Sequence, residues 1–185
     1  MLERLENIVQ MKSGVFAKSG TNPDLFYIQS TDFDKQLSWN KKLNPILTNS
    51  SKFNTHLLKV GDVLFVSKGR NFFAVAYDGA YAPAVASTTF LVLRVKSKIV
   101  LPDYLVWFLN HPQTQSVLWS FAKGSSIPSI SKTILEQIEI PIPNLSKQNT
   151  ILELHKLQLQ EKKIQKQIGK LRQEYINQLT YKSIE

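Results

Sequence analysis

The segment after Pro143 constrains the fold most, because its pattern predicts one long, uninterrupted helix. From Ser146 to the last residue it has no proline and a single glycine, Gly169. About 33 helical residues would extend roughly 50 Å. Glu161 interrupts an apolar heptad pattern at one a position. The other a and d positions hold Leu154, Leu157, Ile164, Ile168, Leu171 and Tyr175.

An apolar stripe on so long a helix must be buried for the helix to be stable. It can be buried against the rest of the chain, a second copy or another protein. Residues 1–143 are too few to cover all of it. We therefore expect an intermolecular coiled coil, formed by a homodimer or with a related chain.

Residues 1–143 predict a separate α+β domain of short strands and helices. Aromatic and β-branched residues mark strands, and Asp78-Gly79 predicts a hairpin turn after the third of them. Helical spacing follows, and a later helix has Ser131 as its N-cap. The predicted strands are 25–29, 63–66, 72–77, 88–95 and the closing 138–143, and the predicted helices are 101–111, the segment opened by Pro112, and 132–137. The expected division is 1–143 and 144–185.

Composition limits the classes of function. The chain has no cysteine, which excludes disulfides, thiolate metal sites and cysteine nucleophiles. It shows neither a signal-peptide core nor an apolar run long enough to cross a bilayer, so we expect a cytoplasmic chain with no membrane partner. The net charge is +9. Residues 1–143 carry 15 basic and 10 acidic residues, and 144–185 carry 8 and 4, so the excess is shared. Such charge is compatible with a polyanion partner or with none.

The sequence holds few residues in catalytic patterns. His56, His111 and His155 are scattered, and no glycine-rich phosphate loop is present. Pro102-Asp103 with the distant Glu161 imitates a nuclease motif, but the first pair is typical of a helix start. We therefore predict no catalytic residues and no metal site.

Basic, polar and aromatic residues cluster instead in four predicted loops. Lys and Arg contact phosphates, and Asn, Ser and Arg can read base edges. For any one of them a solvated loop side chain is the commoner explanation, so the prediction rests on several loops sharing one chemistry. The candidates for DNA binding are Lys12, Ser13 and Lys18; Ser30, Thr31, Lys35, Trp39, Asn40, Lys41 and Lys42; Lys68, Arg70 and Asn71; and Lys123, Ser125 and Ser126.

The order of motifs resembles the specificity subunits of type I restriction–modification systems over nearly the whole chain. The quoted segments are Phe26–Gln29, Leu58–Phe65, Pro102-x-Tyr104-Leu105, Gly124-Ser125-Ser126, the helix with Ser131, Ile134, Leu135 and Ile138, then Ile140-Pro141-Ile142-Pro143, and Gln148 with Ile151. Lys147 stands where the family usually has Glu, a minor departure.

The resemblance implies a non-catalytic subunit whose target-recognition domain reads half of a bipartite DNA site. It implies methyltransferase and restriction subunits as partners, which would bind S-adenosylmethionine, ATP and Mg²⁺, so that this chain binds no cofactor. A full subunit of the family has two domains and two helices, and this chain has one of each. It therefore resembles a half-subunit, with a truncated gene product or a fragment as the alternative. A coiled-coil adaptor and a self-contained DNA-modifying enzyme are the competing hypotheses.

Overall fold

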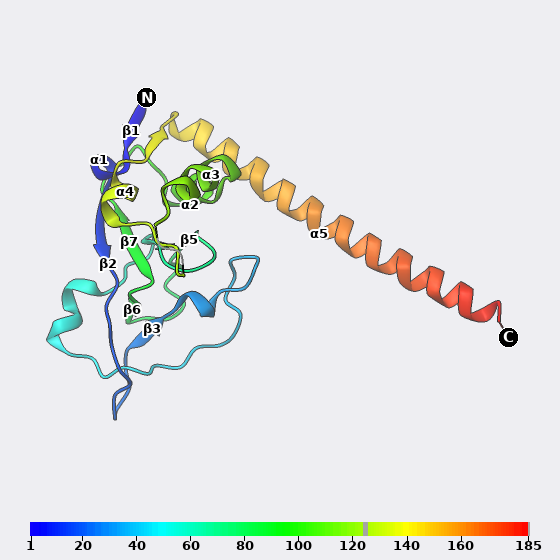
Figure 1. The fold of residues 1–185 in the computed structure, drawn as a ribbon, viewed down its shortest axis with the longest axis horizontal. Coiled ribbons are helices and arrows are strands. Elements are labelled where there is room, and N and C mark those ends of the chain that lie inside the picture. The colour runs from blue at the N-terminus through cyan, green and yellow to red at the C-terminus, as the bar shows by residue number, and fades with distance from the viewer. Residues whose placement is uncertain (124–125, 185) are drawn as a thin grey trace. The chain divides into compact units, whose positions relative to one another are not determined.

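The computed structural model describes residues 1–123 and 126–184 (Figure 1). Fourteen short elements precede one long helix in the described chain. They are β1 (Leu2–Arg4), α1 (Leu5–Ile8), β2 (Val9–Ser13), β3 (Phe26–Ile28), η1 (Ser30–Asp32), η2 (Ser51–His56), β4 (Val63–Val66), β5 (Phe73–Ala76), β6 (Ala84–Ala86), β7 (Phe90–Val95), α2 (Pro102–Asn110), α3 (Pro112–Phe121), α4 (Lys132–Glu136), β8 (Glu139–Pro141) and the long α5 (Leu145–Lys182).

The main sheet has the strand order β2-β7-β4-β5, and every neighbouring pair is antiparallel. All four residues of β4 are buried, which explains its purely apolar sequence. The hydrophobic core on this sheet contains Leu64, Val75 and Phe90. Phe33 and Trp39, from the loop after β3, pack against it. The sheet therefore places the turn between β4 and β5 next to that loop.

Two smaller sheets complete the domain. β1 pairs antiparallel with β8, so the first strand of the chain holds the strand that precedes α5. β3 and β6 form a parallel pair, whose centre is Tyr27 opposite Val85. Burial of the Tyr27 phenol raises its pKa, and its hydroxyl donates to the Val15 carbonyl.

The predicted α+β class and most predicted elements are confirmed, but the prediction of a hairpin at Asp78-Gly79 is wrong. Gly79 has a positive φ of 80°, but Asp78 has none, and a two-residue Asp-Gly hairpin turn requires a positive φ at both residues. In addition, β5 and β6 belong to different sheets. The amide of Asn110 occupies the free edge of β5, accepting from the Ala74 N–H and donating to the Ala74 carbonyl, both at 2.8 Å. A hairpin partner would need the same backbone groups.

The chain divides into two compact units, Met1–Gln148 and Asn149–Glu185. In the second unit, the six predicted a and d side chains are 55–61% exposed in the single chain. Their partner, and the functional division at residue 143, stay predictions. No helix in the described residues is both long and apolar enough to cross a bilayer.

The first turn of α5 belongs to the first unit and is held by Gln148, whose side chain is fully buried. Its amide accepts from the Leu101 N–H at 2.9 Å and donates to the carbonyls of Ile99 (2.7 Å) and Pro143 (2.9 Å). Asn144 caps the same turn by accepting from the Lys147 N–H at 2.9 Å. Gln148 thus joins the segment before α2 to the segment before α5.

Replacing Gln148 with leucine should lower the free energy of unfolding of the first unit by about 3 kcal/mol, because three backbone groups lose their partner. The three tryptophans all precede residue 148, so their fluorescence during urea unfolding reports on this unit. Gln165→Leu is the matched control, since its amide contacts only the exposed Glu161 carboxylate in the described structure. Equal midpoints for the two variants would contradict the role of Gln148.

Candidate nucleic-acid interface

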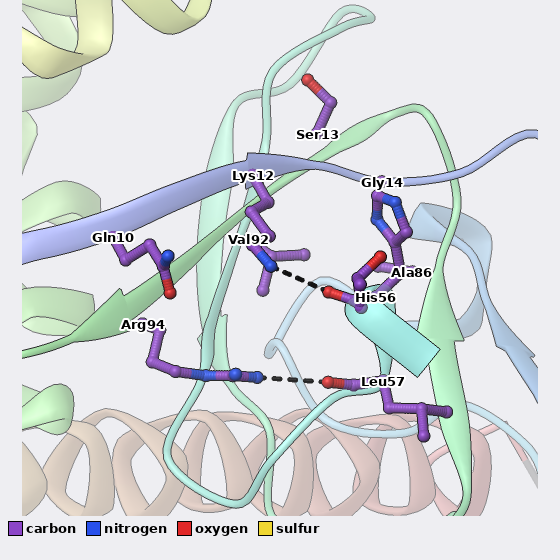
Figure 2. A pocket seen from close by; sticks show the side chains of 10 residues that line it. Gln10, Lys12, Ser13, Gly14, His56, Leu57, Ala86, Val92 and Arg94 are labelled. Carbon is purple, nitrogen blue, oxygen red and sulfur yellow. Dashed lines mark hydrogen bonds between the residues drawn. The ribbon is translucent and has the colours of Figure 1, made fainter. Parts of the chain in front are cut away.

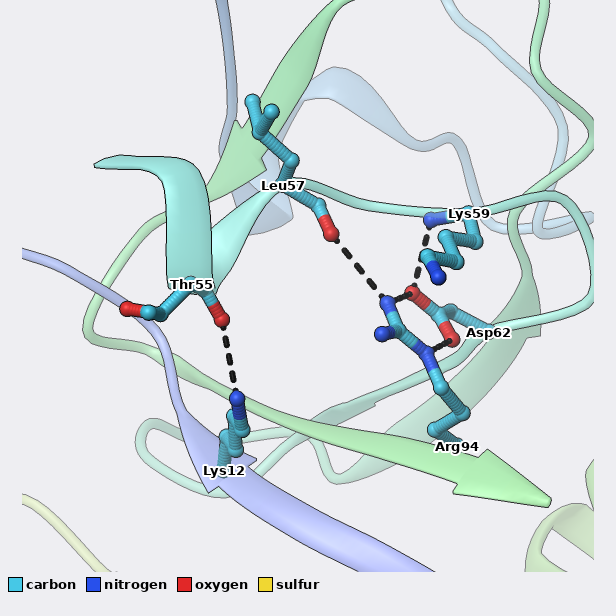
Figure 3. A network of polar contacts seen from close by, with 6 residues as sticks. All are labelled: Lys12, Thr55, Leu57, Lys59, Asp62 and Arg94. Carbon is cyan, nitrogen blue, oxygen red and sulfur yellow. Dashed lines mark hydrogen bonds and ion pairs between the residues drawn. The ribbon is translucent and has the colours of Figure 1, made fainter. Parts of the chain in front are cut away.

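The start of β4 is fixed by an ion pair between Asp62 and Arg94 of β7 (Figure 3). The Arg94 Nε and Nη2 atoms donate to the two Asp62 oxygens at 2.7 and 2.6 Å. Nη2 also donates to the Leu57 carbonyl at 3.1 Å, and the Lys59 N–H donates to Asp62 at 2.8 Å. Arg94 donates to the carboxylate of Asp62, which is 1% exposed, and this hydrogen bonding raises the pKa of Arg94. The pair therefore joins β4, β7 and residues 57–59.

The first predicted group of DNA-binding residues lies beside this ion pair. Figure 2 shows Lys12 and Arg94 pointing from β2 and β7 toward His56 and Leu57. Lys12 donates to the Thr55 carbonyl at 2.9 Å. The pocket between them measures about 20 Å³, enough for about one water molecule and too small for a base. Lys12 therefore holds η2 against the sheet, and Ser13 and Lys18 are exposed nearby in sequence.

The second group follows β3, and several of its side chains shape their own loop. Asp32 is buried, accepts from the Gln29 N–H at 2.8 Å and lies 3.4 Å from the Lys41 ammonium. The Trp39 indole donates to Asp78 at 3.1 Å, and its ring lies 4.4 Å from that of Phe33. Asn40 donates to the Thr31 carbonyl at 2.5 Å. Trp39, Asn40 and Lys41 are thus already engaged within the domain.

The third group lies on the turn between β4 and β5, which we call the β4–β5 turn (residues 67–72). Backbone hydrogen bonds hold it on two sides. The Ser67 N–H donates to Thr89 at 2.9 Å, the Gly69 N–H donates to Pro128 at 3.0 Å, and the Ile130 N–H donates to Ser67 at 2.8 Å. Gly69 has φ = 118°, a conformation that other residues rarely adopt. The first half of the turn, Ser67 to Gly69, is therefore held in place by backbone hydrogen bonds.

A cleft of about 480 Å³ separates the β4–β5 turn from the loop after β3. Its apolar lining is Phe33, Leu37, Val66 and Phe73, and its polar lining is Ser30, Thr31, Asp34, Lys35, Lys68, Arg70 and Asn71. Asp34 Oδ1 already accepts from the N–H groups of Gln36 and Ser38. Two of the four predicted groups thus meet at one cleft, which we call the basic cleft.

The fourth group reaches the β4–β5 turn through its backbone. Ser129 pairs with Lys68 and with Lys123 in isolated bridges, and the Lys123 side chain is exposed. Ser126 is exposed as well, whereas Ser125 lies outside the described residues. Lys41 and Lys42 line a separate cleft of about 300 Å³ that includes Gln29 and Asp32. The structure therefore brings together parts of three predicted groups and leaves the first apart.

Sequence reasoning missed Asp62, Arg94 and Asn110, which position the turn without lining the basic cleft. A faint signal existed for Arg94, a charged residue in an otherwise apolar strand. No group of three or more His, Asp or Glu side chains in the described part of the chain could hold a metal ion.

Comparison with known proteins gives one family and several similar structures. A family model described as the type I restriction modification DNA specificity domain matches residues 15–183. The type I restriction enzyme MjaVIII specificity subunit of Methanocaldococcus jannaschii is 37% identical over 70 residues, which are 38% of this chain and 16% of that protein.

Two solved structures share the fold at low identity. The S subunit of a type I restriction–modification system from M. genitalium has a TM-score of 0.59 at 13% identity, over 85% of this chain and 38% of that one. The HsdS subunit from Thermoanaerobacter tengcongensis has a TM-score of 0.57 at 21% identity, over 86% and 37%. This chain thus spans less than two fifths of either subunit.

Replacing Asp62 with asparagine should lower the free energy of unfolding by about 2–3 kcal/mol, because Arg94 loses its charged partner. The value lies below the range of about 3–5 kcal/mol for fully buried pairs, since a third of the Arg94 side chain is exposed. Urea unfolding followed by tryptophan fluorescence measures it. Asp103→Asn, the same change at an exposed residue of α2, should cost less than about 1 kcal/mol. Equal losses in the two variants would refute the role of the pair.

Proposed function

Because the chain belongs to the family of type I restriction modification DNA specificity domains, we propose that it is a non-catalytic DNA sequence-recognition subunit. Its first unit reads one half of a bipartite duplex site. Methyltransferase subunits, and restriction subunits where they are present, assemble on it and bind S-adenosylmethionine, ATP and Mg²⁺. The complex works in the cytoplasm, where its DNA lies.

The observation that carries this proposal is the basic cleft. Lys35, Lys68 and Arg70 line it, and Lys123 follows on the segment bonded to the β4–β5 turn. No hydrogen bond or ion pair involves these four side chains among the described residues, so their charges are available to phosphates. The net charge of +9 is compatible with the same partner.

The second unit supports a pairing role. The a and d side chains of α5 are exposed in the single chain, and an apolar stripe of this length requires a partner helix. Two copies paired through α5 would supply two recognition domains, which corresponds to a bipartite site with related halves. The chain would then serve as a half-subunit.

Selection from a pool of 40-base-pair duplexes with a randomised centre tests the recognition role. The full-length chain should enrich a bipartite sequence. Absence of any enriched sequence would contradict the proposal, and retention of no duplex at any salt would favour a protein-binding adaptor instead.

Affinity for the selected duplex should fall steeply with salt. If Lys35, Lys68 and Lys123 each neutralise one phosphate, the slope of log K against log salt is about −2.7 or steeper. Fluorescence anisotropy between 50 and 200 mM salt measures this slope. An affinity that does not depend on salt would argue against a phosphate-binding cleft.

The double variant Ile164→Asp, Ile168→Asp should be monomeric, because a coiled coil cannot bury unpaired carboxylates without a large cost. Sedimentation well above micromolar concentration should give a dimer for the unmodified chain. Lys162→Asp with Lys166→Asp places two carboxylates at the same spacing away from the stripe, and this control should stay dimeric. If the unmodified chain is already a monomer, pairing of two copies of this chain through α5 is refuted.

A further inference from the structure

We propose that the β4–β5 turn enters the major groove and that Arg70 and Asn71 read base edges there, while Lys35 and Lys68 contact the flanking phosphates. This inference rests on the proposed DNA-recognition function. It deepens that function by assigning base readout to two of the sixteen candidate residues.

The shape of the turn fits the major groove. β4 and β5 are an antiparallel pair at one edge of the main sheet, paired up to Val66 and Phe73, and β4 also pairs with β7. The major groove of B-DNA is wide enough for an α-helix or two strands, so it can admit the six-residue turn that joins β4 to β5, and its base edges distinguish all four base pairs. Lys68, Arg70 and Asn71 are all exposed on the connecting turn.

The turn is also held in place before any DNA binds. Its backbone is bonded to Thr89 on one side and to Pro128 and Ile130 on the other, and the Asn110 amide holds β5 directly behind it. Anchoring the turn at both ends reduces the conformational entropy that it loses on binding. More of the free energy of base contacts made by Arg70 and Asn71 is therefore available for discriminating between sequences.

Arg70 differs from the other arginines that precede α5. Arg4 lies 3.8 Å from the Glu6 carboxylate, and Arg94 is bound to Asp62 and Leu57. No hydrogen bond or ion pair of the Arg70 side chain is found among the described residues. Its planar guanidinium is thus free for the two parallel hydrogen bonds that guanine O6 and N7 accept.

Asn71 contrasts in the same way with the asparagines around it. Asn40 donates to the Thr31 carbonyl, and Asn110 uses both ends of its amide on Ala74. The Asn71 amide has no such bond within the described chain, and it lines the basic cleft. A free amide can bond to adenine N6 and N7 together. We therefore expect a guanine and an adenine at two positions of one half-site.

The lysines of the cleft suit a different role. Lys35 lies on the wall opposite the β4–β5 turn, and Lys68 lies on the turn itself. An ammonium group acts as a point charge without the paired geometry of guanidinium or amide, so it positions the duplex through phosphates. The two kinds of residue should therefore respond differently to substitution.

Selection from the randomised duplex pool, repeated with variants, tests these assignments. Arg70→Gln should change one position of the selected sequence from guanine toward adenine, because glutamine pairs with adenine. Asn71→Ala should weaken the preference for adenine at one position by about 5- to 150-fold.

Lys68→Ala should weaken binding to all sequences alike and reduce the salt slope by about one. Lys98→Ala, at an exposed lysine outside the cleft lining, should leave the selected sequence unchanged.

The results separate this inference from the function on which it rests. If the unmodified chain enriches a sequence and both Arg70→Gln and Asn71→Ala enrich the same one with equal preferences, base readout by the turn is refuted and DNA recognition stands. If the unmodified chain enriches nothing, the DNA-recognition function itself fails. A new preference in Arg70→Gln cannot come from misfolding, since an unfolded variant would select no sequence.

Discussion

The ion pair between Asp62 and Arg94 is the interaction on which the arrangement of the first unit depends. Burying the Asp62 carboxylate is costly, and the cost is offset here because the partly exposed Arg94 guanidinium bonds to both carboxylate oxygens and to a carbonyl. The pair fixes where β4 begins beside β7. Since β4 has only four residues, fixing its start also fixes where the β4–β5 turn emerges.

Local patterns were enough to predict the single elements, but not how they pair. The strand at 63–66 and the helix opened by Pro112 follow from residue type and spacing. The parallel pairing of β3 with β6 joins residues almost sixty positions apart, and no local period encodes it. The Asp78-Gly79 turn misled for the same reason, because Asn110, far along the chain, occupies the edge that a hairpin would have used.

The residue types of the candidate site could be predicted from the sequence, but their arrangement in space could not. The four loop groups shared basic and polar residues, so sequence treated Lys12, Asn40 and Arg70 alike. The structure separates them by whether the fold already uses the side chain. Lys12 and Asn40 bond to backbone carbonyls, whereas no such bond of Arg70 is found in the described chain. A side chain whose donor groups are already hydrogen-bonded within the fold has fewer of them left for a ligand. Whether they are bonded depends on tertiary contacts, which the sequence alone does not reveal.

The first turn of α5 is held by neutral hydrogen bonds. They join the uncharged amide of Gln148 to three backbone groups. Mobile ions screen charges in solution but affect buried, neutral hydrogen bonds far less. Rising ionic strength would therefore free a bound polyanion while this attachment stays intact. Loss of the ligand and loss of the folded joint are thus two separable transitions, the first governed by salt and the second by denaturant.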